Sequence, residues 1–518
     1  MAGTKKRQRL LRLSVSSKNF YFRPVLFLLF LFGGERPDHE TDEGNKRKIK
    51  LSYLIARNNY ENFLLKEAIM RKLIVLLVSA VCIAAAATAL AQVKVTPLAI
   101  KERELSNGLK VVSVQDGTSP TVSLHVWYDV GGKNDPPGKS GFAHMFEHMM
   151  FKATRNMPDE KMDRLTEDVG GFNNASTWPD YTNYYEVVPS NHLETLLWAE
   201  SDRMVNLNVD EKNFASEREV VKEEYRQGVL APPYGKFYWL LDDITFQKHP
   251  YRRGVIGDLD QLSAATTADA AKFYKDYYRP DNAVLIVVGD FDQKALDGWV
   301  DKYFGRIAKP SGTISRVTEV EPEWTTERRY SETGPRVPFP ATGIVYRAPR
   351  TSSSDISALR IAASILSGGE SSRLYQSLIR NQKIAQQADV DLELNTEGGR
   401  MSLIGIGSAE GTSENLEKAL LAELKKIQDG GITAKELEKA KNQLIARAIG
   451  QRETNDGKAI AIERSVAYLG DPKAVNSEVQ RLQAVSAADV QRVMKTYFKD
   501  NNRVVIYYNQ AKQAEGPK

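Results

Sequence analysis

The chain has 518 residues, which is too long for one hydrophobic core and predicts at least two domains. Its hydrophobic, aromatic and charged fractions of 42%, 9% and 26% are typical of a folded globular protein. The formal net charge of +5 comes from the N-terminus, because residues 1–91 hold sixteen Lys and Arg but seven Asp and Glu. The remainder carries about −4, so nothing indicates a nucleic-acid-binding protein.

Residues 70–91 have the three parts of a secretory signal peptide. Arg71 and Lys72 precede an apolar run, and the run ends in the small-x-small pattern Ala-Leu-Ala at 89–91. We therefore predict cleavage after Ala91 and export, to the periplasm in a bacterial cell. The alternative is an uncleaved membrane anchor, but the run is rich in Ala and only marginally long enough to span a bilayer. We expect no stable membrane anchor.

A signal peptide normally begins at the N-terminus, whereas this one follows 69 other residues. Met70 is then the expected start, and residues 1–69 are a non-native extension that plays no part in the predicted fold. The single cysteine, Cys82, lies inside the signal, so the mature chain has neither a disulfide nor a thiolate ligand. Any bound metal must be held by His and carboxylate side chains.

One helix–strand unit occurs twice, at a constant offset of 220 residues. Residues 268–289 and 488–509 each contain an Asp-led amphipathic helix, an aromatic pair, an Asn-containing turn and a β-branched strand. At the same offset, the strand-like residues 122–130 match 343–349. Two matches at one offset indicate an internal duplication.

We therefore predict an α+β fold of two homologous domains, 92–310 and 336–515, each a mixed β-sheet with helices packed on one face. Strand-like runs alternate with long helical patterns, such as 191–206 and 413–429. Residues 311–335 are rich in Pro, Gly, Ser, Thr and charge, which predicts an extended linker between the domains.

The pattern His144-x-x-Glu147-His148 carries the clearest chemistry. On a helix, two His residues four positions apart project from the same face and can reach one ion. Glu147 lies beside them, where it can take a proton from metal-bound water instead of binding the metal. This order is the inverted zinc motif. The alternative is that these side chains only cap or pack a helix.

Catalytic zinc takes three protein ligands and one water, so a third ligand is needed. Residues 217–224 offer four glutamates on a predicted helix: Glu217, Glu219, Glu223 and Glu224. Glu217 and Glu224 are seven apart and share a face, so one can bind the metal while the other supports a ligand. Spacing alone does not choose among the four.

Three motifs in order resemble the zinc-site region of the pitrilysin/insulinase family, in particular the half-length branch that includes the mitochondrial processing peptidase β-subunit. They are His144-x-x-Glu147-His148, then Gly170-Gly171-x-x-Asn174-Ala175-x-Thr177 with Thr182 and Tyr184-Tyr185, then Glu217 to Glu224. The resemblance implies one Zn²⁺ per chain, bound by His144, His148 and Glu224. It further implies Glu147 as the catalytic base, Glu217 as a supporting residue, and two similar domains that form half of a clamshell.

The Asn174-Ala175 pair has a substrate-binding interpretation as well. A polar segment of small residues near a sheet edge suits backbone pairing with an extended peptide. In the family that it resembles, the matching Asn-Ala holds the substrate backbone. Taken alone, the segment 170–174 indicates only a turn followed by a strand.

The second half cannot repeat the metal site, because no His follows His249. It carries Arg380, which matches an Arg that touches substrate in the resembled family. The Tyr that follows in the family falls here on Gln386 or Gln387, so the pair is incomplete.

These features predict a zinc metallopeptidase that hydrolyses extended peptides or unfolded segments, with Glu147 as general base. One alternative is a non-catalytic peptide-binding or assembly subunit; another is metal storage or sensing, which gives no reason for Glu147. A half-length chain supplies half of the family's clamshell. We therefore expect a homologous half-length partner in a heterodimer, with self-association as the competitor.

Overall fold

The computed structural model describes residues 93–511 without a gap, together with scattered positions between 44 and 75. The chain divides into one unit of residues 1–91 and a second, compact unit of residues 92–518. The described positions of the first unit are helical. The predicted cleavage site and Cys82 lie outside the described residues. Among the described helices, none has both the length and the apolar character needed to cross a bilayer.

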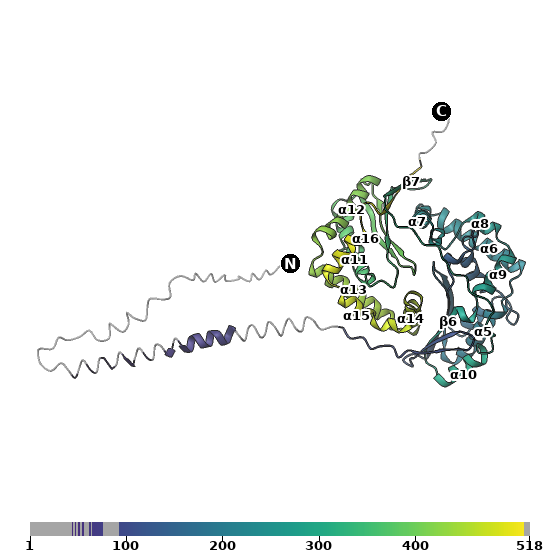
Figure 1. Cartoon of the computed structure of the whole chain (residues 1–518), viewed down its shortest axis with the longest axis horizontal. Helices are drawn as coiled ribbons and strands as arrows, with labels where there is room; N and C mark the ends of the chain where they lie inside the picture. Colours follow the sequence, from purple (N-terminus) through teal and green to yellow (C-terminus); the bar gives the residue numbers. More distant parts are fainter. Residues whose placement is uncertain are drawn as a thin grey trace, which may run out of the picture. The chain divides into compact units, whose positions relative to one another are not determined.

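The second unit contains two mixed β-sheets (Figure 1). The first sheet has the strand order β1-β2-β6-β3-β5-β4, and all neighbours are antiparallel except β2 and β6. Its strands are β1 (Lys101–Glu104), β2 (Lys110–Gln115), β3 (Thr121–Tyr128), β4 (Phe172–Thr177), β5 (Thr182–Pro189) and β6 (Ala283–Gly289).

The second sheet has the order β7-β11-β8-β10-β9, and only β7 and β11 are parallel. Its strands are β7 (Arg328–Gly334), β8 (Ala341–Ala348), β9 (Ala385–Glu393), β10 (Gly399–Gly407) and β11 (Arg503–Gln510). Without β1, the first sheet has the same sequence of parallel and antiparallel pairs. The strands predicted from the 220-residue offset, β3 with β8 and β6 with β11, occupy equivalent places. The predicted duplicated α+β fold is therefore confirmed.

Helices of each half cover one face of that half's sheet. In the first half they are α3 (Phe142–Met149), α4 (Lys161–Glu167), α5 (Leu193–Asn206), α6 (Glu211–Tyr225), α8 (Leu259–Ala264), α9 (Thr267–Tyr277) and α10 (Gln293–Tyr303). In the second half they are α11 (Ile356–Ser367), α12 (Ser413–Gly430), α13 (Ala434–Gln451), α15 (Glu478–Ala484) and α16 (Ala487–Tyr497).

The repeated helix begins in the same way in both halves. Thr266 caps α9 and Ser486 caps α16, each in a capping box with the Asp three residues later. The side-chain oxygen accepts a backbone N–H that the first turn of a helix leaves unsatisfied, and such caps contribute about 1 kcal/mol. This is the physical basis of the Asp-led pattern that the sequence repeats.

The opposite face of each sheet is covered by a helix from the other half, which the prediction of helices on one face did not include. Helix α14 (Asn455–Leu469) packs on β3 and β6 and fully buries Ile462; Figure 1 shows it beside β6. Helix α7 (Gly235–Asp243) packs on the second sheet through Phe237 and Leu241. Burying one such side chain stabilises the fold by roughly 1.5–3 kcal/mol. The two helices begin 220 residues apart, so the exchange is reciprocal.

The predicted linker 311–335 is not only a connection between the domains, because β7 occupies its C-terminal end and belongs to the second sheet. This strand lies at the edge of the second sheet and pairs with β11 as its only neighbouring strand within the described residues. Its sequence, RRYSETG, is largely polar. An edge strand of this kind lacks the apolar alternation that identifies a strand, which is why the sequence pattern missed it.

A buried charged cluster joins α14 to the first sheet. On β3, the Nδ1 atom of His125 lies 2.8 Å from Oε2 of Glu463, and its Nε2 atom lies 3.2 Å from Oδ1 of Asp456. Asn183 donates to the same Glu463 oxygen at 3.0 Å, and Ser123 lies 3.1 Å from Nε2. Both ring nitrogens face carboxylates, and both can donate only when the imidazole is protonated.

Burial alone would lower the pKa of His125, but hydrogen bonds to Asp456 and Glu463 dominate and raise it to about 9. The pKa of His125 is higher in the folded than in the unfolded protein, so protonated His125 stabilises the fold. This stabilisation is fully present below about pH 6.5 and is lost as the pH rises through 9. We predict that stability falls between pH 7 and 10 by up to about 3 kcal/mol from this group. Urea unfolding at each pH measures it.

The matched variant is His125→Gln, which cannot titrate. It should be less stable at pH 7 and lose less stability toward pH 10 than the wild type does. Equal losses in the two proteins would show that His125 does not carry the pH dependence.

Candidate metal centre

Helix α3 is fixed at its N-terminus by a buried carboxylate. The preceding residue, Gly141, has a φ of 87°, and a Cβ there would lie 2.6 Å from the Ile256 carbonyl oxygen, so only glycine fits. Asp135 accepts hydrogen bonds from the N–H groups of Gly141 at 2.7 Å and Ala143 at 2.8 Å. Burial raises the pKa of Asp135 to about 7, although these hydrogen bonds oppose the rise. The helix therefore enters the site at a fixed position.

The four glutamates of α6 fall into two pairs. Glu219 lies 3.0 Å from Lys222, and Glu223 lies 3.1 Å from Arg226, so both make ion pairs on the exposed side of the helix. Glu217 and Glu224 instead face α3. The structure thus directs Glu217 and Glu224, which are seven residues apart, toward α3, and Glu219 and Glu223 toward solvent.

His144, His148 and Glu224 converge on one point. Oε2 of Glu224 lies 3.6 Å from Nε2 of His144 and 3.5 Å from Nε2 of His148. One ligand atom from each of the three residues lies within 4.8 Å of the others. Tetrahedral zinc with bonds of about 2.0–2.2 Å separates neighbouring ligand atoms by about 3.3–3.6 Å. The three side chains therefore fit a zinc ion.

The two imidazoles have different electrostatic surroundings. Burial and the neighbouring His148 lower the pKa of His144 to about 4, so this ring is neutral near pH 7, as a metal ligand must be. Burial would also lower the pKa of His148, but the nearby carboxylates of Glu217, Glu224 and Glu147 raise it. Three carboxylates thus favour a positive charge at this point, which is the condition for cation binding.

Glu217 orients His148 from behind. Its Oε2 atom lies 3.6 Å from Nδ1 of His148, and its Oε1 atom lies 2.9 Å from Nζ of Lys152. Burial would raise the pKa of Glu217, but His148 and Lys152 hold it below its usual value. The carboxylate therefore lies on the Nδ1 side of the ring, while the Nε2 atom faces Glu224.

Glu147 is held by strand β4 and not by the three-residue cluster. Thr177 donates a hydrogen bond from Oγ1 to Oε2 of Glu147 at 2.6 Å. Burial raises the pKa of Glu147, while the Thr177 hydrogen bond and the charge of His148 oppose the rise. One carboxylate oxygen is thereby engaged and the other is left for chemistry.

Asn174 and Ala175 lie on β4, which is one of the two edge strands of the first sheet. The strand pairs with β5 alone within the described residues. Oδ1 of Asn174 accepts a hydrogen bond from the N–H of Ala175 at 2.8 Å. The structure therefore places this pair at an open edge, next to the strand end that touches Glu147.

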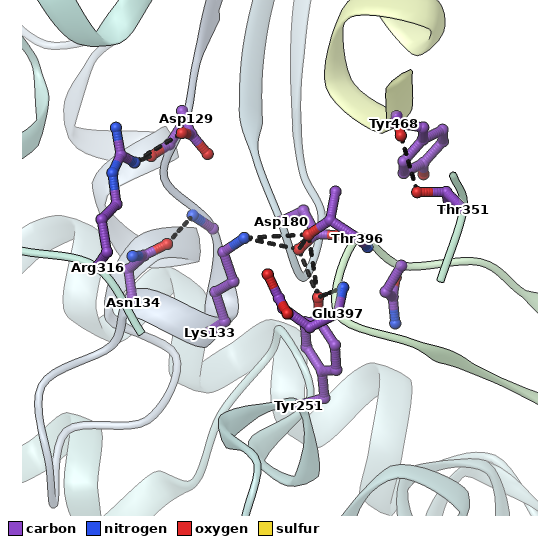
Figure 2. Close-up of polar contacts among 12 residues, drawn as sticks. Asp129, Lys133, Asn134, Asp180, Tyr251, Arg316, Thr351, Thr396, Glu397 and Tyr468 are labelled. Carbon is purple, nitrogen blue, oxygen red and sulfur yellow. Dashed lines mark hydrogen bonds and ion pairs between the residues drawn. The ribbon is translucent and has the colours of Figure 1, made fainter. Parts of the chain in front are cut away.

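The hairpin that follows β4 is tied to the second half through Asp180. Figure 2 shows Lys133, Tyr251 and Thr396 converging on its carboxylate. The Thr396 hydroxyl and Tyr251 hydroxyl each donate at 2.6 Å, and the Thr396 N–H donates at 2.8 Å. Burial would raise the pKa of Asp180, but Lys133 and these hydrogen bonds lower it. The β4–β5 hairpin (residues 178–181) is thus held in place by residues of both halves.

Arg380 lies apart from this cluster. It is exposed in the π-helical segment η6 (Tyr375–Asn381) and makes no ion pair or hydrogen bond through its side chain within residues 93–511. Gln387 lies on β9 and donates to Asp389 at 2.8 Å. No hydrogen bond or ion pair in the described part of the chain joins either side chain to α3 or α6.

Three positioning contacts were not identified from the sequence. Asp135 stands six residues before Gly141, outside any capping pattern, and Lys152 reads as an ordinary surface charge. Thr177 belongs to a recognised motif, but nothing in the spacing assigns it to Glu147. Each contact is set by tertiary packing, and only the four-residue spacing of Lys152 from His148 on a helical pattern offers a local signal.

A duplicated α+β fold with an inverted His-x-x-Glu-His motif in its first copy defines a class of proteins built around a zinc site. The chain belongs to the insulinase family, peptidase family M16. The family model described as Insulinase (Peptidase family M16) matches residues 110–258, and the one described as Peptidase M16 inactive domain matches residues 264–444.

Individual relatives agree with this assignment. The chain is 30% identical over 408 residues to the zinc protease PqqE of Helicobacter pylori. The matched region covers 78% of this chain and 91% of the relative. It is 23% identical over 409 residues to a probable mitochondrial-processing peptidase subunit beta of Arabidopsis thaliana, covering 77% and 76% of the two chains. The crystal structure of a protease from Helicobacter pylori superimposes with a TM-score of 0.77 at 29% identity, covering 80% of this chain and all of that one.

Proposed function

We propose that this chain is a zinc-dependent endopeptidase that binds one Zn²⁺ through His144, His148 and Glu224. The observation that carries the proposal is the 3.5–3.6 Å separation between the Glu224 oxygen and the two Nε2 atoms. The naming of relatives as zinc proteases supports it. The Glu224 side chain is 43% exposed, so the site is open to a substrate.

Bound zinc supplies a Lewis acid that polarises the scissile carbonyl and makes water a better nucleophile. Glu147 accepts the proton of the attacking water and passes it to the leaving amine. Thr177 holds Oε2 of Glu147, so Oε1 is the oxygen that receives the proton. Glu217 keeps Nε2 of His148 directed at the ion.

The substrate is an extended peptide or an unfolded segment that pairs with β4. The open edge offers backbone N–H and C=O groups, which bind a strand whatever its sequence. Ala175 exposes its N–H to a peptide once the Asn174 side chain swings away from it. Arg380 is a further substrate-binding residue in this proposal, reached only by a peptide that extends beyond β4.

A non-catalytic peptide-binding or assembly subunit is the competing function. Two observations favour it: the second half matches a domain described as inactive, and Gln occupies positions 386 and 387. The complete set of His144, Glu147, His148 and Glu224 favours catalysis, because binding alone requires no base next to a metal.

Replacing the base separates metal binding from chemistry. We expect Glu147→Gln to keep about one zinc per chain and to lose at least about a hundredfold in turnover, because Gln cannot accept a proton. Atomic absorption and hydrolysis of casein or a fluorogenic peptide measure the two quantities. Normal cleavage by Glu147→Gln would show that the proposed base is wrong.

Ligand variants provide the matched comparison. His148→Ala and Glu224→Ala should lose both zinc and activity, because each removes one of three ligands. Glu217→Ala should weaken zinc binding by an intermediate factor of about 10–100, since it orients a ligand without touching the ion. If Glu217→Ala binds zinc as tightly as the wild type does, Glu217 does not support the metal ligands.

Export is part of the proposal. A signal peptide at residues 70–91 would be removed after Ala91, and the mature chain would act in the periplasm. Protein purified from its native host should then begin at Gln92, which N-terminal sequencing determines. A mature N-terminus well before Met70 would contradict both the signal peptide and the proposed start.

A homologous half-length partner would complete the substrate contacts. The relative in Arabidopsis thaliana is named as a β-subunit, and the Arg–Tyr pair is incomplete here. We predict that a zinc-less homologue raises peptide hydrolysis on the order of a hundredfold, the cost of losing one orienting contact. Activity titrations, with light scattering to report assembly, measure this.

The competing assembly is a homodimer. In that case the isolated chain reaches full activity at concentrations where light scattering shows two copies, and an added homologue changes nothing. That result would refute the heterodimer.

A further inference from the structure

The open edge of β4 offers two faces to a bound peptide. Successive side chains of a strand alternate between the faces of a sheet. Three residues of β4 face α3 and α4: Asn173 donates to Thr166 at 2.7 Å, Ala175 is buried in the core beside α3, and Thr177 donates to Glu147. This is the metal-side face.

The intervening residues face the other way. Ser176 donates from its hydroxyl to Oδ1 of Asn183 at 2.6 Å, and Trp178 donates from Nε1 to that Ser176 hydroxyl at 3.1 Å. Phe172 has the same parity as Ser176 and therefore points to the same face. Tyr185 lies opposite Asn174 on β5 and stacks near His125 at a ring distance of 5.3 Å, again on this face.

Three aromatic residues of this face, Phe172, Tyr185 and Trp178, form what we call the aromatic shelf. Helix α14 covers the same face over β3 and β6 and reaches β5 through Glu463, which accepts a hydrogen bond from Asn183. Phe172 remains 48% exposed and Trp178 44% exposed, while Tyr185 is half-buried. Large aromatic side chains left exposed together beside an open strand edge are typical of a binding surface.

The shelf is rigid. Trp178 follows β4 in the hairpin that the Asp180 contacts of Figure 2 hold in place. The backbone N–H of Trp178 donates to the Tyr181 carbonyl oxygen at 2.7 Å. Its ring also stacks on Tyr181, with centroids 6.2 Å apart. A peptide that docks here therefore needs no reordering of the hairpin, which reduces the entropic cost of binding.

We propose that the aromatic shelf selects the substrate: extended peptides with apolar side chains at two positions six residues apart, one next to the cleaved bond. This inference rests on the proposed peptidase function. A peptide strand paired with β4 directs one side chain toward Thr177 and Glu147, and its neighbour faces Trp178. The side chain opposite Phe172 lies six positions from that neighbour, about 20 Å along the strand.

Parity makes the proposal specific. Positions i and i+6 of a strand share a face, whereas i and i+5 lie on opposite faces. A peptide with its second apolar residue at i+5 directs that residue toward the metal side and loses the contact with Phe172. The distinction holds for a parallel or an antiparallel peptide.

The test uses peptides of one composition, about 14 residues long, with two Phe residues at i/i+6 or at i/i+5 in a Ser, Gly and Asn background. We expect kcat/KM to be about tenfold higher for the i/i+6 peptide, with the difference mainly in KM. Mass spectrometry should place the cleaved bond within one residue of one Phe. Equal rates for the two peptides would overturn the proposal.

Variants assign the effect to the shelf. Phe172→Ser and Trp178→Ser should each lower kcat/KM for the i/i+6 peptide about tenfold and leave zinc content unchanged. Tyr330→Ser is the matched control, since Tyr330 is a 37% exposed aromatic residue on β7, the edge strand of the second sheet. If both shelf variants still prefer the i/i+6 peptide over the i/i+5 peptide, the proposal is wrong. It is also wrong if Tyr330→Ser loses this preference.

A binding measurement separates this inference from the proposed function. Fluorescence anisotropy of labelled i/i+6 and i/i+5 peptides on Glu147→Gln needs no turnover. Tighter binding of the i/i+6 peptide without cleavage by the wild type would refute the peptidase but keep the shelf. If the wild type cleaves both peptides at equal rates and Glu147→Gln binds both equally well, the peptidase function stands and the aromatic shelf is refuted.

Discussion

The candidate metal centre depends on one helix contact, the packing of α6 against α3. Glu217 lies between His148 and Lys152, with both of its oxygens engaged. Because Glu217 and Glu224 are two helical turns apart on one face, fixing the first also directs the second at the two imidazoles. Removing one partner of a buried charged contact leaves an uncompensated charge, which costs several kcal/mol, so this arrangement tolerates little change.

Some side chains around α3 hold others in position and do not themselves face the candidate metal site. Asp135 fixes the start of the helix, and Thr177 fixes the carboxylate of Glu147. Neither touches the point on which His144, His148 and Glu224 converge. The side chains that would touch a substrate or an ion are therefore held by others that do not, which is the usual condition for a preorganised site.

The sequence predicted the parts of this structure that depend on local pattern. The duplicated unit was found because residues 268–289 and 488–509 share an Asp-led amphipathic helix, an aromatic pair, an Asn-containing turn and a β-branched strand. Strand β7 was missed, since a polar edge strand resembles a linker. The division of the α6 glutamates and the Asp135 cap could not be predicted from spacing, because both are decided by which helix packs alongside. Helices α7 and α14 were not predicted to cover the other half's sheet, because α14 buries mainly small and polar side chains and no local pattern specifies which sheet a helix will cover.

The exchange of α7 and α14 determines the smallest piece of this chain that can fold. A first half without α14 would expose an apolar strip that includes Val112, Ile286 and Val288, all buried here. A second half without α7 would uncover Val345 and Ile404 in the same way. A single repeat is therefore not self-sufficient, and two repeats are required, whether joined in one chain or supplied by two. Once they are joined, the second copy contributes α14 to the first sheet although it has no histidines of its own: at the 220-residue offset, Ser364 and Gly368 stand where the first copy has His144 and His148.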